Sequence, residues 1–103
     1  MAGHVERKFF MGWMIKMFVI PSISYKEAKQ KIASRIKEAR LQSGLSQYDV
    51  AKELNISQSS YSRIERGVLG PDCAQIRVLS GLHGVSILWL LGIPSYIIKA
   101  TNN

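Results

Sequence analysis

The sequence has little of what several classes of protein need. Cys73 is the only cysteine, so no disulfide can form within the chain, and with only His4 and His83 beside it a zinc site is not expected. The chain has no Gly-rich phosphate-binding loop, no nucleophile elbow and no paired acid and base. The spacing around His83 supplies no orienting acid for a catalytic triad. We therefore predict neither an enzyme nor a cofactor-binding protein.

A long apolar run is also lacking. The most apolar stretch, FFMGWMIKMFVI at residues 9–20, is interrupted by Lys16 and is shorter than the roughly 20 apolar residues of a membrane-spanning helix. A short signal peptide is an alternative, but Lys16 and the missing Ala-x-Ala cleavage pattern argue against it. Two other interpretations stay open. The segment packs on the domain or on a partner subunit, or it precedes a true start at Met11, Met14 or Met17.

Acidic residues are outnumbered by basic ones. The chain has 14 Lys and Arg against 7 Asp and Glu, which gives a net charge of +7 and a sequence pI near 9.9. Because 47% of its 103 residues are hydrophobic, we expect one small folded domain rather than a disordered chain. The positive charge should attract polyanions, with nucleic acid and acidic membrane surfaces as the leading candidates. The lack of disulfides favours a cytoplasmic location.

A first helix is predicted from residue 24. Ser24 and Glu27 have the spacing of a capping box, and Gly44 is placed to end the helix. Apolar residues recur between them at helical spacing: Ala28, Ile32, Ile36 and Ala39. The other faces of this helix are mainly basic.

Two short helices joined by a tight turn are predicted next. Ser46 can cap the second helix, and Asn55 can turn the chain because asparagine tolerates a left-handed backbone. Ser57 can cap a third helix that ends at Gly67. Because Ala51 is small enough to let the two helices approach closely, we expect the third helix to project one face from the domain. That face carries side chains suited to hydrogen bonding in the major groove of DNA: Gln58, Ser59, Ser62, Arg63 and Arg66.

These residues carry a family resemblance. The segment SRIKEARLQSGLSQYDVAKELNISQSSYSRIERG resembles the Cro/CI-type helix-turn-helix of the XRE family of phage and bacterial transcription regulators. The segment PDCAQIRVLSGLHGVSILWLLG is similar to that family's fourth and fifth helices. The resemblance implies an all-α, five-helix, lambda-repressor-like domain at residues 24–92, whose second and third helices form the helix-turn-helix. An apolar extension at 1–23 and a tail at 93–103 would flank it.

The resemblance also implies roles for individual residues. Base contacts are expected from four residues of the third helix: Gln58, Ser59, Ser62 and Arg63. Phosphate contacts are expected from five residues: Gln47, Arg35, Arg40, Ser57 and Arg66. The loop VLGPD after Gly67 lacks the basic residues common in this family, so phosphate binding should depend more on the first helix and on Arg66. Arg40 is also expected to form a salt bridge with Glu65, tying the first helix to the recognition helix.

The C-terminal half of the domain carries further expectations. The fourth helix should begin just after Pro71, with Cys73 as a small core residue beside Ile76 and Leu79. His83 stands where the family usually has a core leucine, so we expect it to be partly buried and hydrogen-bonded.

The fifth helix should begin after a Ser86 cap. Its run of successive apolar residues, ILWLL, cannot all face one small core. By analogy with the family Trp89 is assigned to the core. Leu88 or Leu91 is assigned to contact with a second subunit.

The sequence therefore predicts a regulator that binds a specific sequence of double-stranded DNA. It would be a repressor of phage, mobile-element or bacterial type, acting in the cytoplasm at the bacterial nucleoid. A homodimer is expected because one short recognition helix reads few bases, and two half-sites about one helical turn apart supply more specificity. The alternative is an antitoxin-like protein, whose apolar termini bind a partner protein while its helix-turn-helix represses its own operon.

Overall fold

In the computed structural model, residues 20–94 are described and contain five α-helices and no β-strand. The helices are α2 (Tyr25–Ser43), α3 (Gln47–Leu54), α4 (Gln58–Glu65), α5 (Cys73–His83) and α6 (Ile87–Leu90). The predicted all-α class is confirmed. Within these residues no helix is long and apolar enough to span a membrane. Residues 1–19 and 95–103 lie outside the described part, as do the predictions for the apolar termini.

Helix α2 is the longest helix of the compact unit Ile23–Gly92. The Ser24 side chain caps it by accepting a hydrogen bond from the backbone N–H of Glu27 at 3.1 Å, and Gly44 ends it with a positive φ of 71°. The Glu27 carboxylate accepts from the Ser24 hydroxyl at 3.0 Å instead of from the Ser24 backbone. Only one half of the predicted capping box therefore forms.

Helices α3 and α4 are joined by the predicted tight turn. Ser46 and Asp49 form a capping box at the start of α3, and Asn55 ends that helix in the left-handed conformation, with φ 60° and ψ 39°. Ile56 N–H then donates to the Ala51 carbonyl at 3.0 Å, which closes the turn. The two helices contact each other closely where Ala51, only 2% exposed, leaves room for α4.

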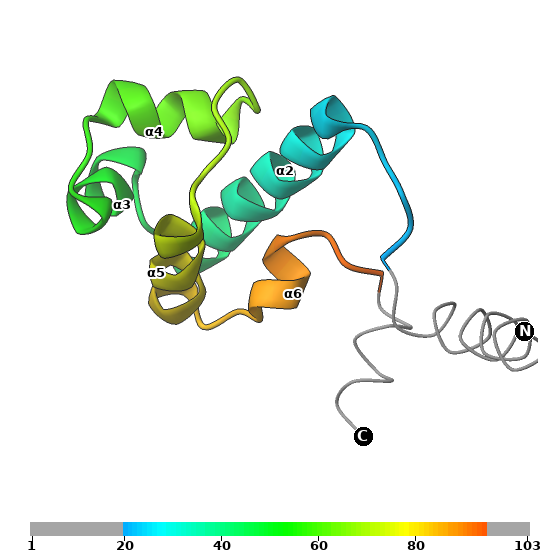
Figure 1. Ribbon diagram of the computed structural model, residues 1–103. Coiled ribbons are helices and arrows are strands. Elements are labelled where there is room, and N and C mark those ends of the chain that lie inside the picture. Colours follow the sequence, from blue (N-terminus) through cyan, green and yellow to red (C-terminus); the bar gives the residue numbers. More distant parts are fainter. Residues whose placement is uncertain (1–19, 95–103) are drawn as a thin grey trace, which may run out of the picture. The chain divides into compact units, whose positions relative to one another are not determined.

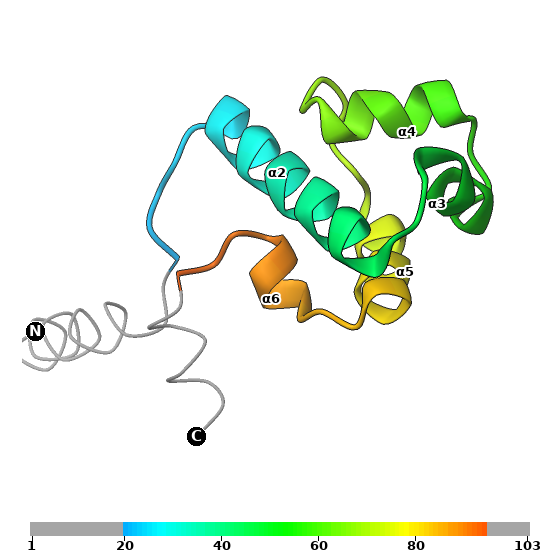
Figure 2. The ribbon, with the colours of Figure 1, turned by 180° about the vertical axis from the view of Figure 1, so that it is seen from behind.

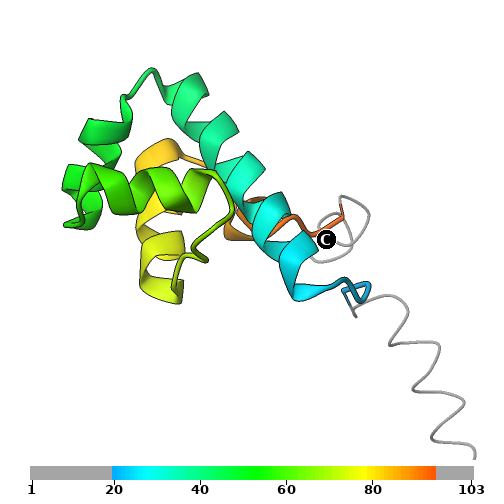
Figure 3. The same ribbon diagram turned by 90° about the horizontal axis from the view of Figure 1, so that it is seen from above.

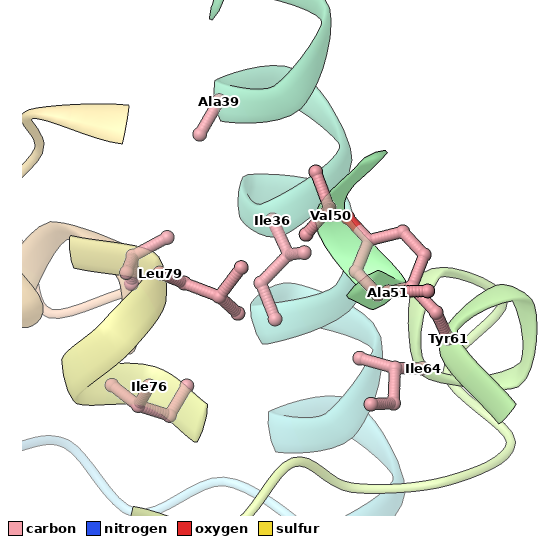
Figure 4. Packing of buried hydrophobic residues seen from close by; sticks show 9 residues of the cluster. Ile36, Ala39, Val50, Ala51, Tyr61, Ile64, Ile76 and Leu79 are labelled. Carbon is pink, nitrogen blue, oxygen red and sulfur yellow. The ribbon is translucent and has the colours of Figure 1, made fainter. Parts of the chain in front are cut away.

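The core lies between α2 and the four shorter helices. Figure 4 shows its central members pointing toward one another from α2, α3, α4 and α5. They are Ile36, Ala39, Val50, Ala51, Tyr61, Ile64, Ile76 and Leu79, which are joined by Leu90 of α6. Fully burying a valine, leucine or isoleucine side chain stabilises a fold by about 1.5–3 kcal/mol. This core fixes the positions of α3 and α4.

Helix α4 lies at an outer edge of the unit. It runs along the top in Figure 1, and in the view from above it lies in front of α5 (Figure 3). Seen from behind in Figure 2, α2 passes between α4 on one side and α6 on the other. The contacts agree, since α2 touches both helices. Among the described residues, no other helix covers the outward face of α4.

Cys73 differs from its predicted place. It is exposed rather than part of the core, and it is the first residue of α5, with Asp72 as the N-cap. Asp72 forms a capping box with Gln75, with N···O distances of 2.7 and 2.9 Å. This cap sets the start of α5 one residue later than predicted and leaves Cys73 at the open end of its first turn. Ile76 and Leu79 are buried as expected.

Candidate nucleic-acid interface

The outward face of α4 carries the predicted base-contact residues. Gln58 and Ser59 lie exposed in its first turn, while Arg63 lies exposed and Ser62 half-buried one turn later. The residues of the opposite face are buried in the domain: Tyr61, Ile64 and Glu65. The amide of Gln58, the hydroxyl of Ser59 and the guanidinium of Arg63 therefore lie in solvent on one side of the helix. Arg66 is exposed at the C-terminal end.

The N-terminal end of α4 is held by Ser57. Its hydroxyl oxygen accepts from the Ser60 backbone N–H at 3.0 Å, and the hydroxyl donates to the Ser60 side chain, also at 3.0 Å. The Ser57 hydroxyl hydrogen thus has an acceptor within the domain. A phosphate contact by Ser57 stays a prediction.

A buried carboxylate organises three of the helices. The Glu65 side chain, 2% exposed, forms an ion pair with Arg40, whose Nε donates to Oε2 at 2.6 Å and whose Nη2 donates to Oε1 at 3.0 Å. The Tyr61 hydroxyl donates to Oε2 at 2.5 Å. Gln47 Nε2 of α3 donates to Oε1 at 3.1 Å. Glu65 therefore links α2, α3 and α4 through charged hydrogen bonds, and we call these four residues the Glu65 network.

The Glu65 network shifts the ionisation of its members. Burial alone would raise the pKa of Glu65, but the hydrogen bonds from Arg40, Tyr61 and Gln47 outweigh it and hold this pKa below its usual value. The hydrogen bond to Glu65 raises the pKa of Arg40 in turn. Burial and the neighbouring carboxylate raise the pKa of Tyr61 well above its ordinary range. The ion pair is therefore charged at neutral pH.

Gln47 lies at the first position of α3 with its amide turned toward Glu65. An amide nitrogen has two N–H groups, so its bond to Glu65 leaves the second for another acceptor. The predicted phosphate contact by Gln47 stays a prediction, and the Glu65 network orients the group that would make it.

Two other predicted phosphate contacts have partners inside the domain. The Arg35 guanidinium lies 4.6 Å from the centre of the Trp89 ring, and its Nη1 donates to the Trp89 carbonyl at 3.3 Å. Arg40 donates to the Leu45 carbonyl as well as to Glu65, and its side chain is only 11% exposed. Sequence reasoning missed the Arg35–Trp89 contact because nothing in the helical periodicity links residues so far apart. Phosphate contacts by both arginines stay predictions.

His83 is partly buried and hydrogen-bonded, as expected. Its Nδ1 lies 2.9 Å from the Ser43 hydroxyl at the end of α2, and its buried Nε2 has no partner among the described residues. Burial lowers the pKa of His83; the charge of Glu65 works against this and that of Arg40 adds to it. The neutral imidazole is the form that this site favours.

Helix α6 divides its apolar residues between the core and the surface. Leu90 is fully buried, and Trp89 is half-buried against the core. Leu91 is 37% exposed and Ile87 39% exposed, whereas Leu88 is half-buried. Ile87 was not singled out in the sequence. Contact between this surface and a second subunit stays a prediction.

Comparison with known proteins identifies a family and a curated relative. A family model described as Helix-turn-helix matches residues 36–90. The HTH-type transcriptional regulator ImmR of Bacillus subtilis (strain 168) is 39% identical over 61 residues, which are 59% of this chain and 48% of that protein. The chain thus spans about half the length of this relative.

Two solved structures share the fold. A hypothetical transcription factor, NHTF, from Neisseria has a TM-score of 0.59 at 20% identity, and the match covers 81% of this chain and 98% of that one. A point mutant of the restriction-modification controller protein C.Esp1396I has a TM-score of 0.55 at 24% identity, with 74% and 97% covered. With the family match, these likenesses confirm the predicted lambda-repressor-like fold, in which α3 and α4 form the helix-turn-helix.

Proposed function

As the chain belongs to the helix-turn-helix family of DNA-binding transcription regulators, we propose that it represses transcription by binding a specific double-stranded sequence as a homodimer. The outward face of α4 carries this proposal, because it presents Gln58, Ser59 and Arg63 to solvent on a helix fixed from behind. An α-helix with such a face fits the major groove, which is about 12 Å wide. A repressor would act at the nucleoid, in the cytoplasm.

Gln58 and Arg63 would read bases in this complex. A glutamine can bond N6 and N7 of adenine together, and an arginine can bond O6 and N7 of guanine. Each such pair contributes roughly 1–3 kcal/mol of discrimination against the wrong base. Ser59 and Ser62 would supply adaptable hydroxyl contacts. Ser62 is half-buried whereas Arg63 is exposed, so the Ser62 hydroxyl lies closer to the body of the domain.

Gln47 and Arg66 would hold the backbone without reading sequence. Gln47 has a second amide N–H to donate to a phosphate, and Arg66 is exposed at the end of α4. Arg35 and Arg40 would add phosphate contacts through the N–H groups that their partners Trp89 and Glu65 leave free. Ser57 would act mainly as the helix cap.

A homodimer would place two α4 helices on one duplex. Helix α4 spans only 8 residues, so a single copy reaches few base pairs. Ile87 and Leu91 of α6 are exposed apolar side chains, and α6 lies on the side of α2 away from α4 (Figure 2). A second subunit bound there would leave α4 open to DNA.

In vitro selection with the full chain tests the proposal. The protein is incubated with a random duplex pool, and the enriched sequences are read over several rounds. We expect a palindrome whose half-sites are about 10–10.5 base pairs apart from centre to centre. A pool that shows no enriched sequence, or a single unpaired half-site, would contradict specific binding by a homodimer.

A further inference from the structure

A hollow borders the predicted reading face on its α3 side. It has a volume of about 570 Å³ and is open to solvent. Tyr48, Lys52 and Asn55 line it from α3 and the turn, and Ser57 and Gln58 line it from the start of α4. A ligand that fills it would therefore touch Gln58, the first residue predicted to contact a base.

Two polar side chains of α3 line this hollow, Tyr48 and Lys52, and we call them the α3 stripe. Tyr48 and Lys52 are four residues apart, so they lie above one another on the same face of the helix. Tyr48 is 61% exposed and Lys52 is also exposed. Gln47 faces another way, toward Glu65. The stripe is thus separate from the phosphate contact proposed for Gln47.

Charge distinguishes this hollow from two others of the unit. Its lining contains the Lys52 ammonium and no carboxylate. A hollow of about 310 Å³ between the end of α3 and the start of α5 is lined by the carboxylates of Glu53 and Asp72. A third, of about 580 Å³ along α2, mixes Lys26 and Lys31 with Glu27. Of these three, only the hollow beside Gln58 has a positive charge in its lining and no carboxylate to repel a polyanion.

We propose that this hollow receives the sugar–phosphate backbone beside the bases that α4 contacts. The Lys52 ammonium and the Tyr48 hydroxyl would donate hydrogen bonds to one phosphate group. This inference rests on the function proposed above. When Gln58 meets base edges, the α3 stripe beside it faces the wall of the groove, and that wall is the phosphate backbone. The positive end of α4 adds to the attraction.

The salt dependence of binding tests the contact. Wild type, Lys52→Ala, Tyr48→Phe and Lys31→Ala are titrated with the selected site and with random duplex at several salt concentrations. Lys31→Ala is the matched control, since Lys31 is an exposed lysine of α2 that lies beside Gly92, after the end of α6. Because all these side chains are exposed, the variants should fold, and circular dichroism checks this.

Loss of one phosphate contact has a defined signature. For Lys52→Ala we expect the slope of log K against log salt concentration to become shallower by about 0.9. Binding to the selected site and to random duplex should weaken by the same factor, since a phosphate carries no sequence information. Tyr48→Phe should weaken both about tenfold with little change in slope, because it removes a hydrogen bond and no charge.

The outcomes separate this inference from the proposed function. If wild type selects no sequence, the proposed function fails. If wild type binds its site specifically but Lys52→Ala keeps the wild-type slope, as Lys31→Ala should, the phosphate contact is refuted. A loss confined to the selected site would also refute it, because that result assigns Lys52 to base contact.

Discussion

Replacing Arg40 by alanine should expose how much the fold depends on the Glu65 network. Arg40 donates two hydrogen bonds to a carboxylate whose side chain is 2% exposed, so the variant leaves a buried charge with only Tyr61 and Gln47 as donors. Breaking a buried ion pair by removing one partner costs about 3–5 kcal/mol. Small domains have a free energy of unfolding of about 5–15 kcal/mol, so the loss is a large share of the total.

The pH dependence of this loss identifies its cause. In wild type the pKa of Glu65 is lowered below 4.5, so the ion pair stabilises the fold above that pH, and this contribution is lost as the pH falls through the folded pKa. In Arg40→Ala burial acts on Glu65 without the cation, and its folded pKa should rise above 4.5. Protonation of Glu65 then stabilises the folded state of the variant, whereas it destabilises the folded state of wild type. The difference in the free energy of unfolding between wild type and Arg40→Ala should therefore become smaller toward acid pH.

Urea unfolding measures the difference directly. Wild type, Arg40→Ala and the exposed-site control Lys37→Ala are unfolded at about pH 7 and about pH 4, with far-ultraviolet circular dichroism as the signal. The control should stay within about 0.5 kcal/mol of wild type at both pH values. An Arg40→Ala loss that is equally large at both pH values would refute the electrostatic reasoning and point to lost packing alone.

Three further changes test other parts of the structure. Because Asn55 has a φ of 60°, Asn55→Ala should cost about 1–2 kcal/mol in urea unfolding, and Asn55→Gly should cost less; equal costs would contradict this. Ala51→Leu should cost about 1–3 kcal/mol by overpacking the contact between α3 and α4, and a neutral result would show that the contact adapts. Since burial lowers the pKa of His83, charging it opposes folding, and wild-type stability should fall as the pH drops below 6.5. His83→Leu should lack this fall in thermal unfolding between about pH 7 and about pH 5, and a fall that persists would assign it to other groups.

Much of the fold was predictable because local chemistry determines it. The caps Ser46 and Ser57, the left-handed Asn55 and the small Ala51 are each favoured by the backbone or packing at that position, so the sequence pattern identified them. The start of α5 was predicted one residue too early, because Pro71 and Asp72 both suit the beginning of a helix. The reciprocal bonds between Asp72 and Gln75 decided it and left Cys73 outside the core.

The candidate site was less predictable, because its polar contacts join distant parts of the chain. Family resemblance predicted the pairing of Arg40 with Glu65, but the bonds from Tyr61 and Gln47 to the same carboxylate depend on how three helices meet. The contact between Arg35 and Trp89 likewise needs α2 and α6 in place. Residue type indicated which side chains can bind phosphate, and only the packing showed which ones already have partners.

The most direct test compares Gln58→Ala with Gln47→Ala on the selected DNA site. Dissociation constants are measured for wild type and both variants on that site and on random duplex at one salt concentration. If α4 reads bases and the start of α3 holds the backbone, Gln58→Ala should lose about 1–3 kcal/mol of specific binding and keep most of its affinity for random duplex. Gln47→Ala should weaken both. A Gln58→Ala variant with unchanged preference for the selected site would contradict reading by α4.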